Sequence, residues 1–233
     1  MPDHFIETNI IIGYTVDWDQ QAPVVKQYLD SITRIDIHTS PRVLTEAEDV
    51  VNDRRRLTKQ AARLIFQDFD TGRRQPPIQQ IVDFVWRELS HYRDSVVSHV
   101  VQHIRDHEQY YIGLTQVDTR TVLERTTDDI DDDFDAVISI ITSIRNHNCD
   151  GLNCSVFANI KQDYSTLSVF GTVDSILSGK SNDRDILLDS YHLTQEESLN
   201  PLYFVTMDGD FLDNESRLES CLGSVDIEHP TTV

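Results

Sequence analysis

Lysine and cysteine are both scarce in this 233-residue chain. Only four of the 20 basic residues are lysines, and the three cysteines (Cys149, Cys154 and Cys221) cannot all pair, which excludes a disulfide framework. No apolar run approaches the roughly 20 residues that a membrane-spanning helix needs. The first residues also lack the basic start and apolar run of a secretory signal. These absences predict a protein of the reducing cytoplasm with no membrane partner.

Acidic residues outnumber basic residues by 40 to 20, so the chain carries a net charge of −20. Of the acids, 29 are aspartates, and arginine largely replaces lysine among the bases. Short carboxylates keep a surface hydrated in concentrated salt, where a Debye length of about 3 Å at 1 M screens their repulsion. With 39% hydrophobic residues, the chain has too much core-forming material for an acidic disordered protein. The composition therefore predicts a folded protein adapted to high salt.

Apolar segments that read as strands alternate with amphipathic helices toward both ends of the chain. Strands are expected at about 4–6, 34–38, 202–206 and 225–228. Helices are expected at 19–31, 42–69 (with a candidate break near residue 58), 165–177 and 186–192. This alternation predicts an α/β fold with a parallel central sheet flanked by helices.

The middle of the chain is expected to form a mostly helical insertion at about 75–150, within a single domain that spans 1–233. Apolar residues recur at helical spacing over 78–104 and predict one helix of nearly 30 residues there. The acidic run at 128–135 suggests a calcium loop, but it lacks the turn glycine and the glutamate at the twelfth position. We therefore interpret the run as the acidic start of a helix over 136–144.

Carboxylates fall just beyond strand ends or in the first turns of helices. The residues placed in this way are Glu7, Glu46 (or Glu48), Asp185 (or Asp183), Asp208 and Asp210. Because the carboxyl ends of parallel strands meet at one edge of a sheet, we expect these side chains to lie close together. Crowded carboxylates are costly unless a cation neutralises them, and hard oxygen ligands favour Mg²⁺ or Mn²⁺. The sequence therefore predicts a divalent metal site at this edge.

Four segments around these acids resemble, in order, the motifs of the PIN-domain nuclease family, in a haloarchaeal type of composition. The segments are FIETNII (5–11), IHTSPRVLTE (37–46), DILL (185–188) and FVTMDGDF (204–211). The family motifs comprise a strand that ends in an acid before Thr-Asn, a helix with a metal-site glutamate, a third acid, and a strand that ends in Thr-x-Asp. The resemblance covers about 1–70 and 180–230 and leaves the middle of the chain unmatched.

The resemblance implies a PIN-like, Mg²⁺- or Mn²⁺-dependent ribonuclease that hydrolyses RNA phosphodiester bonds at a cluster of carboxylates. It assigns catalytic and metal-binding roles to Glu7, Glu46, Asp185 and Asp208, a further ligand to Asp210, and supporting hydrogen bonds to Asn9 and Thr206. Implied partners are RNA and an antitoxin-like protein or a second copy, bound through the helical insertion. The usual first acid of the family is aspartate, and the longer Glu7 can displace a ligand by about an ångström. The alternative is a catalytically inactive PIN-like module that binds protein or RNA.

One basic segment lies at 53–74, which carries a net charge of +4 while the rest of the chain carries −24. Within it, Arg55, Lys59 and Arg63 are spaced by four residues, so they share one face of a helix. A stripe of this kind would suit the backbone of RNA. Ion pairs with the protein's own acids account for the stripe equally well.

Two groups of residues have the spacing of zinc ligands. His99, His103 and His107 recur every four residues, and a histidine pair at this spacing can bind Zn²⁺ or Ni²⁺. The favoured interpretation is a solvated or partner-facing stripe on a helix. A histidine and two cysteines at 147–154 offer three ligands without an evident fourth, so a zinc site there is disfavoured.

Overall fold

The structure, a computed structural model, describes residues 2–32, 35–69, 76–111, 119–146, 154–158, 160–161, 163–197, 199 and 201–233. Its contacts divide the chain into two compact units. Unit 1 comprises Met1–Thr15, Gln21–Glu48 and Ile140–Val233, and unit 2 comprises Val16–Gln20 and Asp49–Ser139. The expected organisation as one domain with an insertion at 75–150 stays a prediction.

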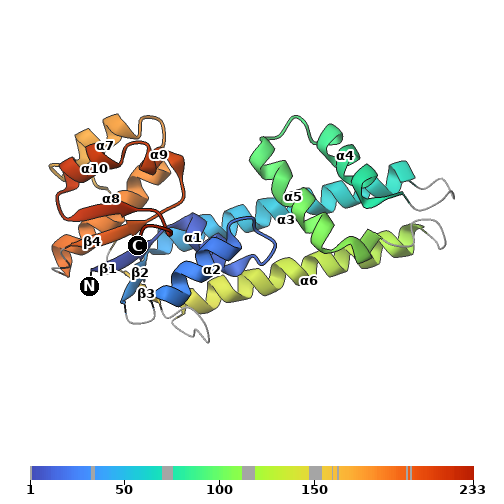
Figure 1. Cartoon of the computed structure of the whole chain (residues 1–233), viewed down its shortest axis with the longest axis horizontal. Coiled ribbons are helices and arrows are strands. Elements are labelled where there is room, and N and C mark those ends of the chain that lie inside the picture. Colours follow the sequence, from blue (N-terminus) through green and yellow to red (C-terminus); the bar gives the residue numbers. More distant parts are fainter. Residues whose placement is uncertain are drawn as a thin grey trace. The chain divides into compact units, whose positions relative to one another are not determined.

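Unit 1 is built on a five-stranded sheet (Figure 1). In chain order the strands are β1 (Asp3–Ile6), β2 (Ile37–Thr39), β3 (Cys154–Val156), β4 (Leu202–Val205) and β5 (Val225–Glu228). Their order in the sheet is β3-β2-β1-β4-β5, and every neighbouring pair is parallel. The predicted α/β fold with a parallel central sheet is therefore confirmed.

The direction of strand addition reverses between β1 and β4. The chain adds β2 and β3 on one side of β1, and it then returns to place β4 and β5 on the other side. β1 pairs with β4 in a register that runs from Asp3 opposite Leu202 to Ile6 opposite Val205. In open parallel sheets, ligands bind beyond the carboxyl ends of the strands at such a reversal. The ends of β1 and β4 are therefore where a site is expected.

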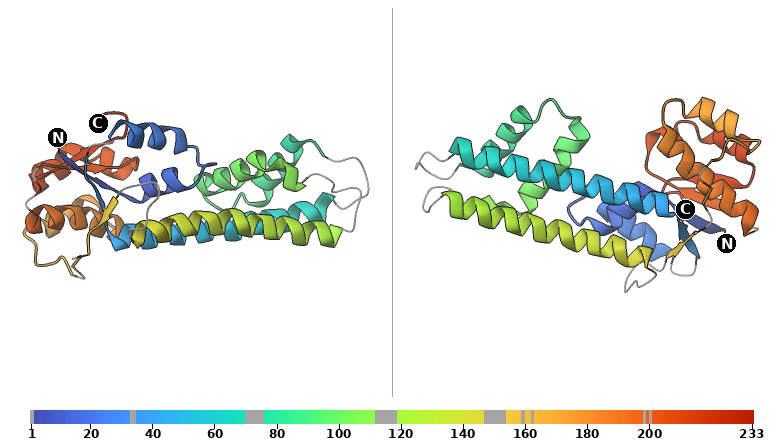
Figure 2. Two further views of the ribbon diagram at one scale, coloured as in Figure 1. Left: turned by 90° about the horizontal axis from the view of Figure 1, so that it is seen from below. Right: turned by 180° about the vertical axis from the view of Figure 1, so that it is seen from behind.

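Helices flank the sheet of unit 1 on both faces, with α2 on one side and α8 on the other in the left view of Figure 2. The helices are α1 (Thr8–Thr15), α2 (Ala22–Ser31), α7 (Phe170–Ile176), α8 (Ser181–Glu196), α9 (Gly209–Leu212), α10 (Glu215–Leu222), the start of α3 (Pro41–Phe69) and the end of α6 (Thr119–Arg145). α3 begins as its sequence predicts, because Ser40 Oγ accepts the Val43 N–H at 3.4 Å and Pro41 stands in the first turn. This start fixes the helical phase of the residues that follow β2.

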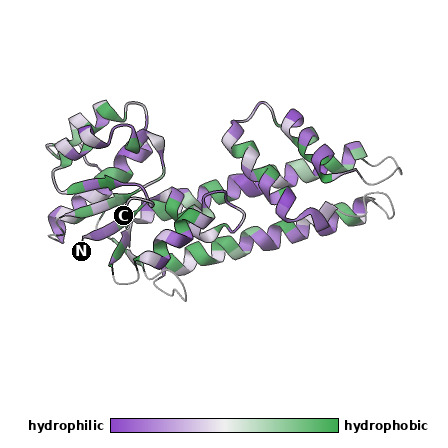
Figure 3. Cartoon of the chain, in the orientation of Figure 1, coloured by the Kyte–Doolittle hydropathy of each residue, from purple (hydrophilic) through white to green (hydrophobic). Residues whose placement is uncertain are grey.

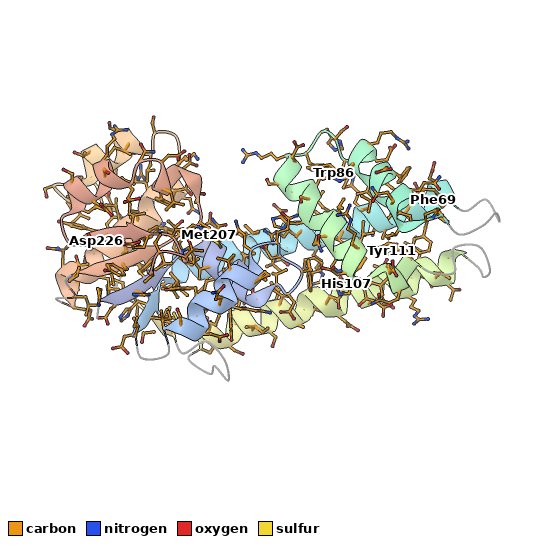
Figure 4. All side chains as sticks on the ribbon, in the orientation of Figure 1. Phe69, Trp86, His107, Tyr111, Met207 and Asp226 are labelled. Carbon is orange, nitrogen blue, oxygen red and sulfur yellow. The ribbon has the colours of Figure 1, made fainter. Side chains whose placement is uncertain are left out.

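The described residues of unit 2 form helices joined by turns and include no strand. The unit contains the rest of α3, then α4 (Ile78–Glu88), α5 (Asp94–Asp106), the 3₁₀ helix η1 (Glu108–Tyr111) and most of α6. Within this unit α3 and α6 run side by side (Figure 2), and hydrophilic and hydrophobic residues alternate along both helices (Figure 3). An aromatic pair joins α3 to α4: the Phe69 ring packs edge-on against the Phe84 ring, with 5.3 Å between the ring centroids. Phe69 is labelled in Figure 4.

Three helix predictions for this region were wrong. The helix expected over 78–104 is two helices, because the chain turns after the buried Leu89, and Asp94 starts α5 where an acid suits the helix dipole. No break occurs near residue 58, since α3 continues through it, and the Thr58 hydroxyl bonds back to the Arg54 carbonyl at 2.9 Å within the helix. The acids at 128–135 do not start a helix, because α6 already begins at Thr119.

The boundaries of smaller elements also differ from expectation. β2 begins at Ile37 rather than at 34, because the Ile35 N–H closes a turn onto the Ile32 carbonyl at 2.9 Å; Arg34 itself lies outside the described residues. The helix expected over 165–177 is the shorter α7. α8 starts at Ser181 rather than at 186, which places both Asp183 and Asp185 inside it. β3 was not expected.

No helix among the described residues is both long enough and apolar enough to cross a membrane.

Candidate metal centre

Glu7 follows β1 and is almost completely buried, with 4% of its surface exposed. One carboxylate oxygen accepts the backbone N–H of Asn9 at 3.0 Å, and the other accepts the hydroxyl of Thr206 at 3.1 Å. Thr206 follows β4, and its oxygen accepts the Asp208 N–H at 3.0 Å, which leaves its hydrogen for Glu7. A chain of hydrogen bonds therefore joins the ends of β1 and β4 at the point where the strand order reverses.

Burial raises the pKa of Glu7 to about 8. The hydrogen bonds from Asn9 and Thr206 oppose this shift, and the nearby charges of Asp208 and Glu46 add to it. Near neutral pH a carboxyl group with this pKa is largely protonated. An opposite charge beside it would favour the ionised form again, so the site is chemically suited to a cation.

Glu46 reaches the same region from the second turn of α3. The Thr8 hydroxyl at the start of α1 donates a hydrogen bond to Glu46 Oε2. Because Thr8 directly follows Glu7 in the chain, this bond ties Glu46 to the end of β1. Glu48, the alternative acid in the sequence, forms an ion pair with Arg145 at 2.9 Å. Glu46 is therefore the acid of α3 that lies beside Glu7.

Asp183, Asp208 and Asp210 each offer one carboxylate oxygen, and these three oxygens lie within 4.8 Å of one another. Asp208 caps α9, since its Oδ1 accepts the Asp210 N–H at 2.7 Å. Burial raises the pKa of Asp183, and the charges of Asp208 and Glu46 raise it further, against the opposing effect of Lys180. Lys180 also forms an ion pair with Asp210.

The charges of Glu46 and Asp208 thus raise the pKa of both Glu7 and Asp183. We refer to Glu7, Glu46, Asp183, Asp208 and Asp210 as the carboxylate cluster. The labelled Met207 marks its place beside the end of β4 in Figure 4.

Asp185, which the sequence motif favoured, has basic neighbours instead. Its carboxylate accepts a hydrogen bond from Arg184 at 2.8 Å and lies 3.6 Å from Arg42. Residues two apart in a helix point about 200° away from each other, so Asp183 and Asp185 cannot share a face of α8. The sequence kept Asp183 as the alternative to Asp185, and it placed the start of α8 five residues too late.

The basic stripe belongs to unit 2, where two of its three members bind the protein's own acids. Arg55 donates to Asp131 at 2.6 Å and to Asp135 at 2.7 Å, and Lys59 contacts Asp131 at 2.7 Å. Arg63 is exposed and has no ion-pair partner among the described residues. Residues 73 and 74, which complete the basic segment, lie outside the described part of the chain. Own-chain ion pairs therefore account for Arg55 and Lys59.

A second group that could hold a metal ion lies in unit 2 and consists of His103, His107 and Asp133. The four-residue spacing of the histidines was visible in the sequence. Asp133 belongs to another helix, α6, and no sequence pattern placed it beside the histidines. His99, the third member of the histidine stripe, instead lies beside Arg54 and Asp19. Residues 147–153, which include most of the disfavoured zinc group, are outside the described residues.

A scan against protein-family models found no match to this chain, and searches of curated proteins and of solved structures found none either.

Proposed function

We propose that unit 1 is a divalent-metal-dependent ribonuclease of the PIN type. The observation that carries this proposal is the convergence of carboxylates from separate elements at the reversal of strand order. Glu7 follows β1 and Asp208 follows β4, whereas Glu46 comes from α3, Asp183 from α8 and Asp210 from α9. Their order along the chain is that of the four PIN motifs, with Asp183 in place of Asp185.

The donor set of the cluster fits Mg²⁺ or Mn²⁺. All of its side chains offer carboxylate oxygens, which suit hard cations. Among the described residues, Lys180 is the only basic side chain within ion-pair distance of the cluster. The ligands would be Glu7, Glu46, Asp183 and Asp208, with Asp210 beside them. When bound, the ion would supply activation of water and stabilisation of the departing oxygen in phosphodiester cleavage.

The residues of the chain prepare the site for this chemistry. Two donors hold the Glu7 carboxylate in one orientation, and the Asp210 N–H holds Asp208. Preorganised groups of this kind lower the cost of positioning during reaction. The Lys180 side chain is 42% exposed, so its ammonium group lies where an anionic phosphate would approach. RNA binding by the exposed Arg63, and docking of a protein partner or second copy on unit 2, belong to this proposal as hypotheses.

A catalytically inactive module that binds RNA or protein is the second candidate. It is favoured by one observation, which is that burial of the long Glu7 side chain raises its pKa to about 8. A metal-free site of this kind holds a proton at neutral pH, so weak divalent binding would leave the cluster inactive.

The test is cleavage of fluorescent single-stranded and hairpin RNA in molar KCl, with Mn²⁺, Mg²⁺ or a chelator. We expect cleavage only with the divalent ions. Asp183→Asn should remove it, whereas the matched variant Asp185→Asn, two residues away on the same helix, should retain it. Folded Asp208→Asn protein that cleaves at the wild-type rate would rule out this site. Wild-type protein without divalent binding or cleavage would favour the inactive module over the ribonuclease.

A further inference from the structure

The ring of His107 is held by a backbone carbonyl. Its Nδ1 lies 3.0 Å from the carbonyl oxygen of His103, one helical turn earlier. A carbonyl oxygen only accepts hydrogen bonds, so Nδ1 carries the hydrogen and the neutral ring has its lone pair on Nε2. That Nε2 lies 3.5 Å from Oδ2 of Asp133. A lone pair and a carboxylate oxygen repel each other unless a proton or a metal ion lies between them.

His103 directs a second ring nitrogen at the same carboxylate oxygen. Its Nε2 lies 3.2 Å from Asp133 Oδ2, and its side chain is completely buried. Within the described residues its Nδ1 has no hydrogen-bond partner. The rings of His103 and His107 stack with their centroids 4.3 Å apart. Two imidazole nitrogens and one carboxylate oxygen therefore converge, all within 4.8 Å of one another.

Supporting contacts hold these three side chains in place. The Tyr110 hydroxyl lies 3.1 and 3.0 Å from the two oxygens of Asp133 and donates to the carboxylate. The Trp18 ring packs edge-on against His103 and His107, with centroid distances of 5.0 and 5.4 Å. Metal-binding histidines usually donate their other N–H to a carbonyl or carboxylate, and metal-binding carboxylates are themselves hydrogen-bonded. His107 and Asp133 have these partners, and His107 is labelled in Figure 4 between α5 and α6.

We propose that His103, His107 and Asp133 form a binding site for a transition-metal ion of the Zn²⁺ class, separate from the carboxylate cluster. Two imidazoles and one carboxylate favour Zn²⁺, Co²⁺ or Ni²⁺ over Mg²⁺. Three protein ligands leave one tetrahedral position for water or another ligand. His107 and Asp133 are 18% and 20% exposed, so an ion can enter from their side. The bound ion joins α5 to α6 and stabilises unit 2.

Co²⁺ is the probe for this site, because four-coordinate Co²⁺ with nitrogen ligands absorbs visible light strongly and six-coordinate Co²⁺ with oxygen ligands absorbs weakly. Titration of the full chain should give strong absorption that saturates at about one equivalent and is displaced by Zn²⁺. His107→Ala should lose this absorption, and Tyr110→Phe should weaken Co²⁺ binding about tenfold. His91→Ala, which removes an exposed histidine of the same unit, should bind as the wild type does.

Asp208→Asn separates this proposal from the ribonuclease proposal, since it alters the carboxylate cluster alone and should leave the strong absorption intact. Circular dichroism of each variant checks its fold. If His107→Ala does not fold, the isosteric Asp133→Asn replaces it. Absence of strong absorption in the wild type, or its persistence in the folded ligand variant, would overturn the proposal. The histidines would then be partners of Asp133 in an ordinary ion pair.

Discussion

Acidic side chains gather in two places, the carboxylate cluster of unit 1 and the 128–135 segment of α6 in unit 2. The pKa values of the acids shift in opposite directions in the two places. In α6, partial burial alone would raise the pKa of Asp131, but hydrogen bonds from Lys59 and Arg55 lower it below its usual value. In unit 1, burial and neighbouring carboxylates raise the pKa of both Glu7 and Asp183. Acid-rich composition is common to both, so what distinguishes the carboxylate cluster from Asp131 is the shortage of arginine and lysine partners.

The largest expected effect on stability comes from removing Asp19, a buried acid of unit 2 that forms an ion pair with Arg54. The Asp19 carboxylate lies 2.9 Å from Arg54, and their side chains are 2% and 12% exposed. Asp19→Ala leaves the Arg54 charge buried without this partner and should lower the free energy of unfolding by about 3–5 kcal/mol. Denaturant unfolding in molar KCl measures the loss. A loss below about 1 kcal/mol would mean that water replaces the carboxylate, and the contrast between the two units would weaken.

The second prediction concerns the pH dependence of stability that Glu7 of the carboxylate cluster should cause. Glu7 has a pKa of about 8 in the folded, metal-free protein against 4.5 as its ordinary value, so the folded state binds more protons between these pH values. Stability is therefore highest below pH 4.5 with respect to this group, and it falls as pH rises toward about 8, by up to roughly 5 kcal/mol. Glu7→Gln should remove this component. Thermal unfolding with a chelator from pH 5 to 9 checks it, and parallel profiles for the two proteins would contradict the shift.

The third prediction compares two members of the basic stripe. Arg55→Ala breaks the pairs with Asp131 and Asp135 and should cost about 1 kcal/mol, because the partners are partly solvated. Arg63→Ala, its matched control two helical turns later, should change stability by less than about 0.5 kcal/mol. In RNA-binding assays the order should reverse, with Arg63→Ala reducing the salt slope by about 1 if it contacts a phosphate. Equal effects of both variants on stability would remove the distinction.

The smallest effect concerns Lys180, the one base that the described part of the chain places within ion-pair distance of the carboxylate cluster. Lys180 and Asp210 are both about two-fifths exposed, so Lys180→Gln should lower stability by only about 0.5 kcal/mol in high salt. The same change removes a cation that competes with a metal ion, so Mn²⁺ should bind more tightly. Calorimetric titration with Mn²⁺ tests this, with Lys161→Gln as the control. Weaker Mn²⁺ binding in Lys180→Gln would show that the ammonium group supports the site instead.

Features that depend on neighbouring residues could be read from the sequence. The apolar runs predicted β1 and β4, and the Ser-Pro start of the helix after β2 placed Glu46. These local signals also placed Glu7 and Asp208 beyond strand ends. The parallel sheet followed from the alternation of strands and helices.

Features that depend on helical phase or on distant partners could not be read in this way. The sequence left Asp183 and Asp185 as alternatives, and it placed the start of α8, which contains both, five residues too late. β3 has three residues and one buried side chain, too few for a periodic signal. The pairing of Lys59 with Asp131 joins residues 72 apart, and nothing near either residue indicates it. The same holds for Asp133 beside His103, which is 30 residues away.

The hydrogen bond from Thr206 to Glu7 joins residues 199 apart in the chain, and this separation has a consequence for synthesis on the ribosome. β1 emerges first, but its neighbour β4 and the acid Asp208 emerge only after unit 2 has been made. Helices with local contacts form quickly, whereas pairings of distant strands form slowly. Unit 2 can therefore fold while β1 has only β2 and not yet β4 beside it. A nascent chain carries an incomplete carboxylate cluster, so the proposed metal site forms only after β4 and Asp208 have been made.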